Sequence, residues 1–386
     1  MASKLASIEV ECECGCVHEL FSMHVYFNDF DALIKELENE DLKVIRLFIS
    51  EDIEKCERVV QIIKLLSDAG FEILKTIIKC NHAETIKANS IQYEGEEYIL
   101  SIGNSNLFEM VKYYAYSVNV NFSLILNNEF YDYTFSKFAR LYDGLNFNFY
   151  SCSAPQSIIF FNEDFKSVDY YKMILYFKAK NIVLFENLLT EKYETLNVCR
   201  KINSKIRKIL KLSDKIIDVK DILHCCVFLG RAMSFFNCTK GFFGAEIEIA
   251  NQLEIITKKN FIECFLMGSE TLRRIYIAAL NKNLSIHYFD INMRIDKIKI
   301  LLSITATKCL TFIKKPKDGE VLDKQIKIAC ALKFKLLSFL EDFEITQTMS
   351  VSEKALSRAI YIAPEMTVRY TFLNLLRDLG YFERLV

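Results

Sequence analysis

The chain has 386 residues, of which 51% are hydrophobic, and its 49 basic and 50 acidic side chains leave a formal net charge of −1. This balance gives no electrostatic basis for binding nucleic acid or an anionic membrane, and no apolar run approaches the roughly 20 residues of a membrane-spanning helix. The start of the chain lacks the apolar core of a signal peptide, and the 13 cysteines are an odd number. We therefore expect a cytoplasmic protein of two domains with reduced thiols.

Residues 1–165 alternate between short apolar runs and amphipathic segments. A β-hairpin is expected over 8–26 around Cys14-Gly15-Cys16. The remaining strands are expected at 44–49, 73–78, 98–102, 122–126 and 157–161, and the helices at 30–39, 53–69 and 107–117. This βαβ alternation predicts a parallel sheet with helices on both faces.

Residues 166–386 have helical periodicity almost throughout. The expected helices are 170–186, 197–212, 222–236, 246–257, 261–280, 291–307, 326–340, 353–360 and 368–379, with a turn at 314–319. The predicted fold class is thus α/β plus all-α: a Rossmann-like nucleotide-binding domain, 1–165, followed by a helical domain, 166–386. A ligand is expected between two such domains.

The stretch ILSIGNSNLFEMVKYYAY at 99–116 predicts a strand, a tight turn and a helix. Such a unit presents backbone amides to a phosphate at the helix N-terminus, so Gly103, Asn104, Ser105 and Asn106 are candidate cofactor-binding residues. Only Gly103 is a glycine, although close approach of backbone to a ligand favours glycine. The bend therefore predicts a weakened dinucleotide site.

Five segments follow one another in an order found in a known family. They are CECGCVH at 12–18, the 99–116 stretch, NNEFYDYTFS at 127–136, TKGFFGAEIEIANQLE at 239–254 and RYTFLNLLRDLG at 369–380. In this order the chain resembles the sn-glycerol-1-phosphate dehydrogenases, relatives of dehydroquinate synthase, glycerol dehydrogenase and iron-containing alcohol dehydrogenases. The resemblance implies a dehydroquinate synthase-like fold and an NAD(P) cofactor, with Lys112 and Asp132 kept among the cofactor-binding positions.

The resemblance also implies one catalytic divalent metal held by an aspartate and two histidines. At those positions this chain has Lys180, Ile247 and Phe261, and none of its five histidines falls on them. Ile247 and Phe261 have no lone pair for a metal, which needs about three protein ligands. We therefore expect no metal site. Lys180 is either an ammonium that replaces the charge of the ion or a surface lysine.

Three functional hypotheses follow from this pattern. The first is a divergent, glycerol-1-phosphate dehydrogenase-like pseudoenzyme that binds a nucleotide or small phosphorylated ligand, forms a homo-oligomer or pairs with an active homologue. The second is an active NAD(P)-dependent and metal-dependent sn-glycerol-1-phosphate dehydrogenase. The third is metal-free chemistry carried by Lys180 or Glu263.

Two cysteine-containing segments have less specific patterns. Cys12, Cys14 and Cys16 alternate on the predicted hairpin and would share one face, but a plain hairpin without metal is favoured there. Cys225 and Cys226 lie in an apolar helix, where we expect them to be small core residues.

Overall fold

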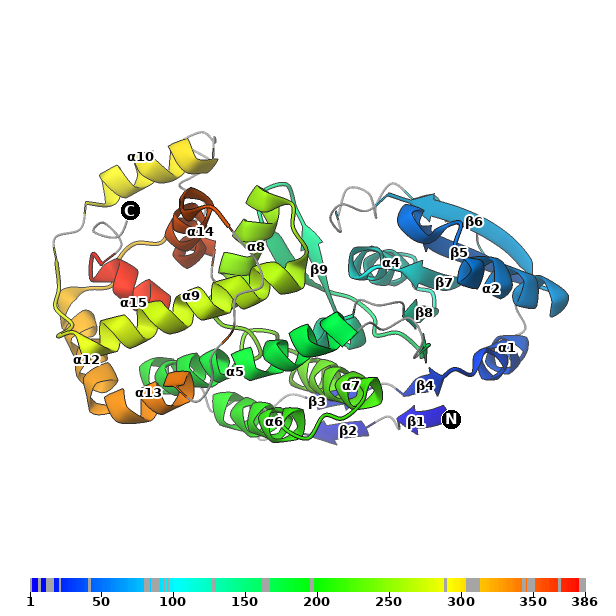
Figure 1. Cartoon of the computed structure of the whole chain (residues 1–386), viewed down its shortest axis with the longest axis horizontal. Coiled ribbons are helices and arrows are strands. Elements are labelled where there is room, and N and C mark those ends of the chain that lie inside the picture. The colour runs from blue at the N-terminus through cyan, green and yellow to red at the C-terminus, as the bar shows by residue number, and fades with distance from the viewer. Residues whose placement is uncertain are drawn as a thin grey trace. The chain divides into compact units, whose positions relative to one another are not determined.

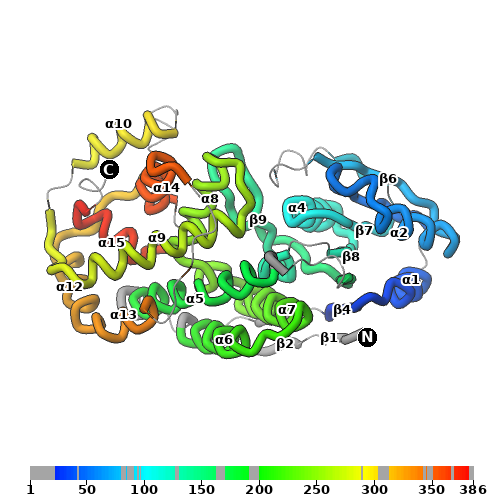
Figure 2. Tube along the Cα trace, viewed as in Figure 1, coloured from blue at the N-terminus to red at the C-terminus, as the bar shows by residue number. Residues whose placement is uncertain are grey.

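The computed structural model, traced along its Cα atoms in Figure 2, describes most residues of the chain. They are residues 2–5, 8–11, 17–20, 22–40, 43–79, 84, 91–93, 95, 97–126, 130–161, 167–194, 198–287, 290–302, 313–341, 345, 351–366 and 369–381. The contacts divide the chain into two compact units. The first comprises Met1–Tyr171 with Lys215–Thr239, and the second comprises Lys172–Asp214 with Lys240–Val386.

The first unit is built on a seven-stranded sheet. In spatial order its strands are β1 (Ala2–Leu5), β4 (Met23–Phe27), β11 (Ser157–Phe160), β8 (Phe122–Leu126), β7 (Glu97–Gly103), β5 (Val44–Ser50) and β6 (Glu72–Ile78). Only β1 is antiparallel to its neighbour, and the other six strands run parallel. The predicted parallel sheet is confirmed.

Alternation along the strands divides the sheet into two packed faces. Ile45, Leu47 and Ile49 of β5 join one core with α1 (Phe30–Glu38) and α2 (Glu57–Asp68). Phe48, which lies between Leu47 and Ile49, points to the opposite face of the sheet. The centre of its ring is 5.5 Å from that of Tyr114 of α4 (Ser105–Ser117). Because strand side chains alternate in direction, these apolar strands are covered by helices on both faces, as predicted (Figure 1).

The start of the chain departs from the predicted hairpin over 8–26. The hairpin consists of β2 (Ile8–Glu11) and β3 (Val17–Leu20) alone, whereas β4 belongs to the main sheet. Cys12, Cys14 and Cys16 lie outside the described residues. A second hairpin, β9 (Phe138–Tyr142) with β10 (Phe147–Ser151), was not predicted.

The second unit is helical, as predicted. Its helices are α5 (Ser167–Glu194, from Lys172 onward), α6 (Val198–Ser213), α8 (Ala245–Thr257), α9 (Phe261–Asn281), α10 (Ile291–Leu302), α12 (Gly319–Ala331), α13 (Lys333–Glu341), α14 (Glu353–Met366) and α15 (Phe372–Asp378). Helix α8 packs against α9 and α14 (Figure 1). The helix predicted over 326–340 is wrong in extent, because it is broken at Leu332 between α12 and α13. None of the helices in the described ranges combines the length and apolar character needed to cross a membrane.

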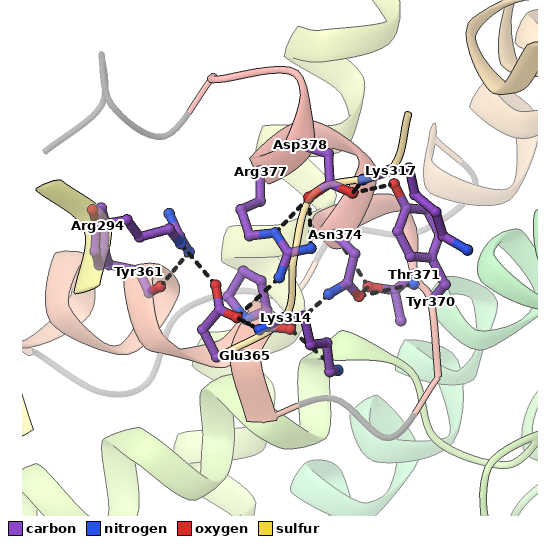
Figure 3. A network of polar contacts seen from close by, with 11 residues as sticks. Arg294, Lys314, Lys317, Tyr361, Glu365, Tyr370, Thr371, Asn374, Arg377 and Asp378 are labelled. Carbon is purple, nitrogen blue, oxygen red and sulfur yellow. Dashed lines mark hydrogen bonds and ion pairs between the residues drawn. The ribbon is translucent and has the colours of Figure 1, made fainter. Parts of the chain in front are cut away.

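A buried ionic network holds the C-terminal helices together (Figure 3). Glu365 of α14 accepts hydrogen bonds from Arg294 Nε at 2.7 Å and from Arg377 Nη1 at 3.0 Å. Asp378 is paired with Arg377 Nη2 at 2.5 Å and accepts a hydrogen bond from Tyr370 at 2.9 Å. Each buried charge has a partner of opposite sign, which offsets the cost of removing it from water.

Helix α7 (Val219–Phe236) belongs to the first unit, where it packs against the short 3₁₀ helix η2 (Asp132–Phe135). Cys225 and Cys226 are buried in it, as predicted. Gly230 makes this contact possible, because a Cβ there would collide with the Asp132 carbonyl oxygen and lie 2.8 Å from Phe135.

Gly230→Ala should therefore lower the free energy of unfolding by about 1–3 kcal/mol through overpacking. The matched control is Gly319→Ala at the start of α12, where a Cβ would meet no atom within 4 Å. Urea unfolding of both variants measures the difference. Equal stability of the Gly230 variant and the natural chain would show that α7 does not need this close approach.

Candidate functional site

The turn after β7 is closed by the chain's own side chains. The Asn104 amide donates to Ser50 Oγ at 3.1 Å, and Asn104 Oδ1 accepts a hydrogen bond from the Leu107 amide at 3.1 Å, as an N-cap of α4. A Cβ on Gly103 would collide with Ser50 Oγ. Ser105 is buried and Asn106 is half-buried. The turn is where the sequence predicted it, but two of its amides, those of Asn104 and Leu107, already donate to the side chains of Ser50 and Asn104.

Lys112 and Asp132 both lie inside the first unit. The Lys112 ammonium donates to the carbonyl oxygens of Phe138 at 2.5 Å and Tyr133 at 2.7 Å, and to Glu109 Oε2 at 3.2 Å. Asp132 Oδ1 accepts a hydrogen bond from the Tyr133 amide at 2.9 Å. Lys112 thus fastens α4 to the segment around η2 and β9.

The three residues at the expected metal-ligand positions are all buried in the second unit. Lys180 of α5 is 0% exposed, Ile247 of α8 is 4% exposed and Phe261 of α9 is 5% exposed. Lys180 is therefore not a surface lysine. Its ammonium donates to the Phe242 carbonyl oxygen at 3.1 Å and lies 3.9 Å from the centre of the Phe243 ring. Within the described residues, no three His, Cys, Asp or Glu side chains form a group that could hold a metal ion.

Glu263, the other candidate for metal-free chemistry, lies on the first turn of α9. Its carboxylate forms an ion pair with Lys172 Nζ at 2.9 Å, and its side chain is 28% exposed. This environment is that of a partly solvated ion pair, in which each charge gains little.

Two carboxyl groups that the sequence interpretation passed over approach each other at Gly244. Glu186 Oε2 accepts a hydrogen bond from the Ala245 amide at 3.0 Å, and Glu246 Oε1 accepts one from the Gly244 amide at 2.8 Å. A Cβ on Gly244 would collide with Glu186 Oε2 and would lie 2.6 Å from Glu246 Oε2. Both side chains are completely buried. Only glycine leaves room for the pair.

Arg369 and Tyr276 complete the polar cluster around Glu186. Arg369 Nη2 lies 3.2 Å from Glu186 Oε2, and its Nη1 donates to Asn187 Oδ1. Tyr276 donates to Glu186 Oε1 at 2.5 Å, and its ring stacks on Phe185 at 4.9 Å. Arg369 therefore belongs to this site, whereas the neighbouring Tyr370 hydrogen-bonds to Asp378 of α15.

Burial dominates the proton affinities at this cluster. The pKa of Glu186 is raised to about 7, and burial is the main cause. The negative charge of Glu246 also raises this pKa, whereas Arg369 and the hydrogen bond from Tyr276 lower it. Burial also raises the pKa of Glu246, against the Gly244 amide and the Lys180 ammonium. Because two close carboxyl groups titrate together, the pair takes up a proton near neutral pH.

Solved dehydrogenases share the fold of this chain. NADH-dependent butanol dehydrogenase A from Thermotoga maritima is 12% identical, with a TM-score of 0.55 over 93% of this chain and 96% of that chain. Glycerol dehydrogenase from Schizosaccharomyces pombe is 12% identical, with a TM-score of 0.54 over 93% and 88% of the two chains. A probable glycerol dehydrogenase from Sinorhizobium meliloti 1021 is 10% identical, with a TM-score of 0.54 over 94% and 96%.

Neither a protein-family model nor a curated protein matches the sequence. The structural likeness confirms the predicted fold class, an α/β part followed by a helical part. At these identities the likeness concerns the fold, and the chemistry has to be argued from the side chains of this chain.

The raised pKa of Glu186 predicts that the free energy of unfolding falls as the pH rises from about 4.5 to 7. In this range the folded chain holds a proton that the unfolded chain has released. Glu186→Gln should flatten the pH dependence of the melting temperature between pH 5 and 8. Glu263→Gln, at a partly exposed carboxylate, is the control and should leave it unchanged. Parallel pH profiles for the natural chain and Glu186→Gln would show that Glu186 is not the titrating group.

Proposed function

We propose that this chain is a divergent relative of the sn-glycerol-1-phosphate dehydrogenases that has lost metal-dependent dehydrogenation. In this proposal it acts as a cytoplasmic binding protein for a nucleotide or small phosphorylated ligand, alone or paired with an active homologue. One observation carries the proposal: a buried lysine ammonium and two apolar side chains stand at the three expected ligand positions.

The donor set does not fit a divalent metal. Ile247 and Phe261 offer only hydrocarbon, and the Lys180 ammonium has three N–H donors and no acceptor. Zinc or iron requires lone pairs from nitrogen, oxygen or sulfur, and a positive charge already at the position would repel the ion. The buried carboxyl groups of Glu186 and Glu246 in the same unit already accept hydrogen bonds from backbone amides, and Glu186 is also paired with Arg369. We therefore route no reaction step through a metal.

The β7–α4 turn fits a dinucleotide poorly. A pyrophosphate needs free amides at the helix start and glycine where the backbone comes close. Here Asn104 caps the Leu107 amide, and Ser50 accepts the Asn104 amide. The positive end of the α4 dipole still favours a phosphate, which supports a weakly held phosphorylated ligand in place of a tightly bound NAD(P).

Isothermal titration with NADH and NADPH should accordingly show weak binding or none. A dissociation constant in the low micromolar range would contradict the reasoning about the turn. The same titration on Asn104→Gly, which frees the Leu107 amide, should show tighter binding than the natural chain if the cap is what excludes the cofactor.

The proposed loss of activity is tested by nicotinamide absorbance. The purified chain should neither oxidise sn-glycerol-1-phosphate nor reduce dihydroxyacetone phosphate at a useful rate, with or without added zinc, nickel or iron, since Lewis-acid assistance worth several kcal/mol is missing. Turnover that a chelator abolishes would contradict the proposal and would show an active metal-dependent dehydrogenase.

Restoring ligands should restore metal binding first. The triple variant Lys180→Asp, Ile247→His, Phe261→His is expected to bind one zinc or nickel ion per chain in calorimetric titration, while activity stays low because the β7–α4 turn is unchanged. The double variant Ile247→His, Phe261→His keeps the ammonium and is the matched control. Equal metal affinity of the two variants would show that Lys180 is not at the ligand position.

A further inference from the structure

The Lys180 ammonium lies in a cage of aromatic rings. Its nitrogen is 3.9 Å from the centre of the Phe243 ring, 4.8 Å from that of Tyr176 and 5.7 Å from that of Phe265. The nitrogen also donates to the Phe242 carbonyl oxygen at 3.1 Å and to the Tyr176 hydroxyl at 3.4 Å. Aromatic faces and carbonyl oxygens attract an ammonium ion, and the attraction is strongest where water is excluded.

The cage comes from three separate elements that packing holds in place. Tyr176 and Lys180 are one turn apart on α5, so they share a helix face. The ring of Phe265 of α9 packs against the rings of Tyr176 and Phe261, with distances between ring centres of 4.7 Å and 5.7 Å. Phe242 and Phe243 precede α8 and are also buried. The rings therefore form a built surface around the ammonium.

The cage stands next to the buried carboxyl pair Glu186 and Glu246. Glu246 follows Phe243 by three residues and feels the Lys180 charge. Its Oε2 atom is buried and has no hydrogen-bond partner. Arg369 is paired with the other carboxylate, Glu186. The Lys180 ammonium favours the ionised form of Glu246, which burial disfavours.

We propose that the helical unit contains an ammonium-binding site, formed by Tyr176, Phe242, Phe243 and Phe265 beside Glu246, which the chain's own Lys180 side chain occupies. Its ligand class is a primary alkylammonium ion, and the resident ligand is intramolecular. The inference rests on the proposed absence of a metal at this position. It adds what replaces the metal and why the replacement is an ammonium.

The test removes the tethered ligand and offers a free one. Lys180→Ala deletes three side-chain carbons and the nitrogen, which match the three carbons and the nitrogen of n-propylammonium. We expect this variant to melt several degrees below the natural chain and n-propylammonium at millimolar concentration to restore several degrees in a saturable way, as a ligand of the folded state does. 1-Propanol, which has the same chain without the charge, should give no such recovery.

Lys172→Ala is the matched control, because Lys172 lies on the same helix in a partly exposed ion pair with Glu263. The natural chain and Lys172→Ala should not respond to n-propylammonium. A response of all three proteins, or equal recovery with 1-propanol, would overturn the proposal, because neither reports a specific ammonium site.

Lys180→Met covers the case in which the alanine variant does not fold. Methionine fills the cage without a charge, so this variant should melt below the natural chain and ignore n-propylammonium. If Lys180→Ala does not fold by itself, its refolding from denaturant should yield soluble protein only in the presence of n-propylammonium. Lys180→Met that is as stable as the natural chain would refute the need for a charge there.

Adding zinc to the natural chain distinguishes a failure of this inference from a failure of the proposed function. Stabilisation of the natural chain by zinc would overturn both. If zinc has no effect and n-propylammonium fails to rescue Lys180→Ala, only the ammonium site is refuted and the loss of the metal stands.

Discussion

Four ionisable groups, three of them completely buried, determine the interior of the helical unit. Glu186 and Glu246 meet at Gly244, and Arg369 and Lys180 supply the opposing charges. In a medium of low effective dielectric constant, the two positive groups offset part of the cost of burying the two carboxyl groups. The absence of a Cβ at Gly244, the aromatic cage and the position of the segment that carries Arg369 follow from this constraint. The Arg294–Glu365–Arg377–Asp378 network obeys the same rule at the C-terminal helices (Figure 3).

The first unit shows a related internal use of polar groups. Where a cofactor-binding α/β protein offers its turn amides to a phosphate, two amides of this turn, those of Asn104 and Leu107, donate to the side chains of Ser50 and Asn104. Lys112 likewise donates to backbone carbonyl oxygens and to Glu109. In both units, residues at positions of expected ligand chemistry instead join one element of the fold to another. This shared feature is consistent with the function proposed above.

The sequence predicted much of the fold because the deciding signals are local. Apolar runs such as Val44–Ser50 alternate with amphipathic helices, and that alternation suffices for a parallel sheet. The break at Leu332 and the unpredicted hairpin Phe138–Ser151 depend on tertiary packing, which periodicity does not report.

The candidate site was harder to predict for the same reason. Glu186 lies in an otherwise apolar stretch of α5, and a lone acid on a buried helix face is a usable signal, but its partners Glu246 and Arg369 come from distant segments. Lys180 was recognised by its position in the resemblance. Its burial, however, depends on Phe243 and Phe265, which only the packed structure brings to it.

The proposed function requires that the Lys180 ammonium stands at the position where the resemblance to the sn-glycerol-1-phosphate dehydrogenases implies a metal ion. The most direct measurement is elemental analysis of the purified natural chain after incubation with excess zinc or nickel and removal of unbound ions by gel filtration. The account predicts far less than one ion per chain, because the position offers a cation and two hydrocarbon side chains. One ion per chain that is lost on mutating Lys180, Ile247 or Phe261 would contradict it.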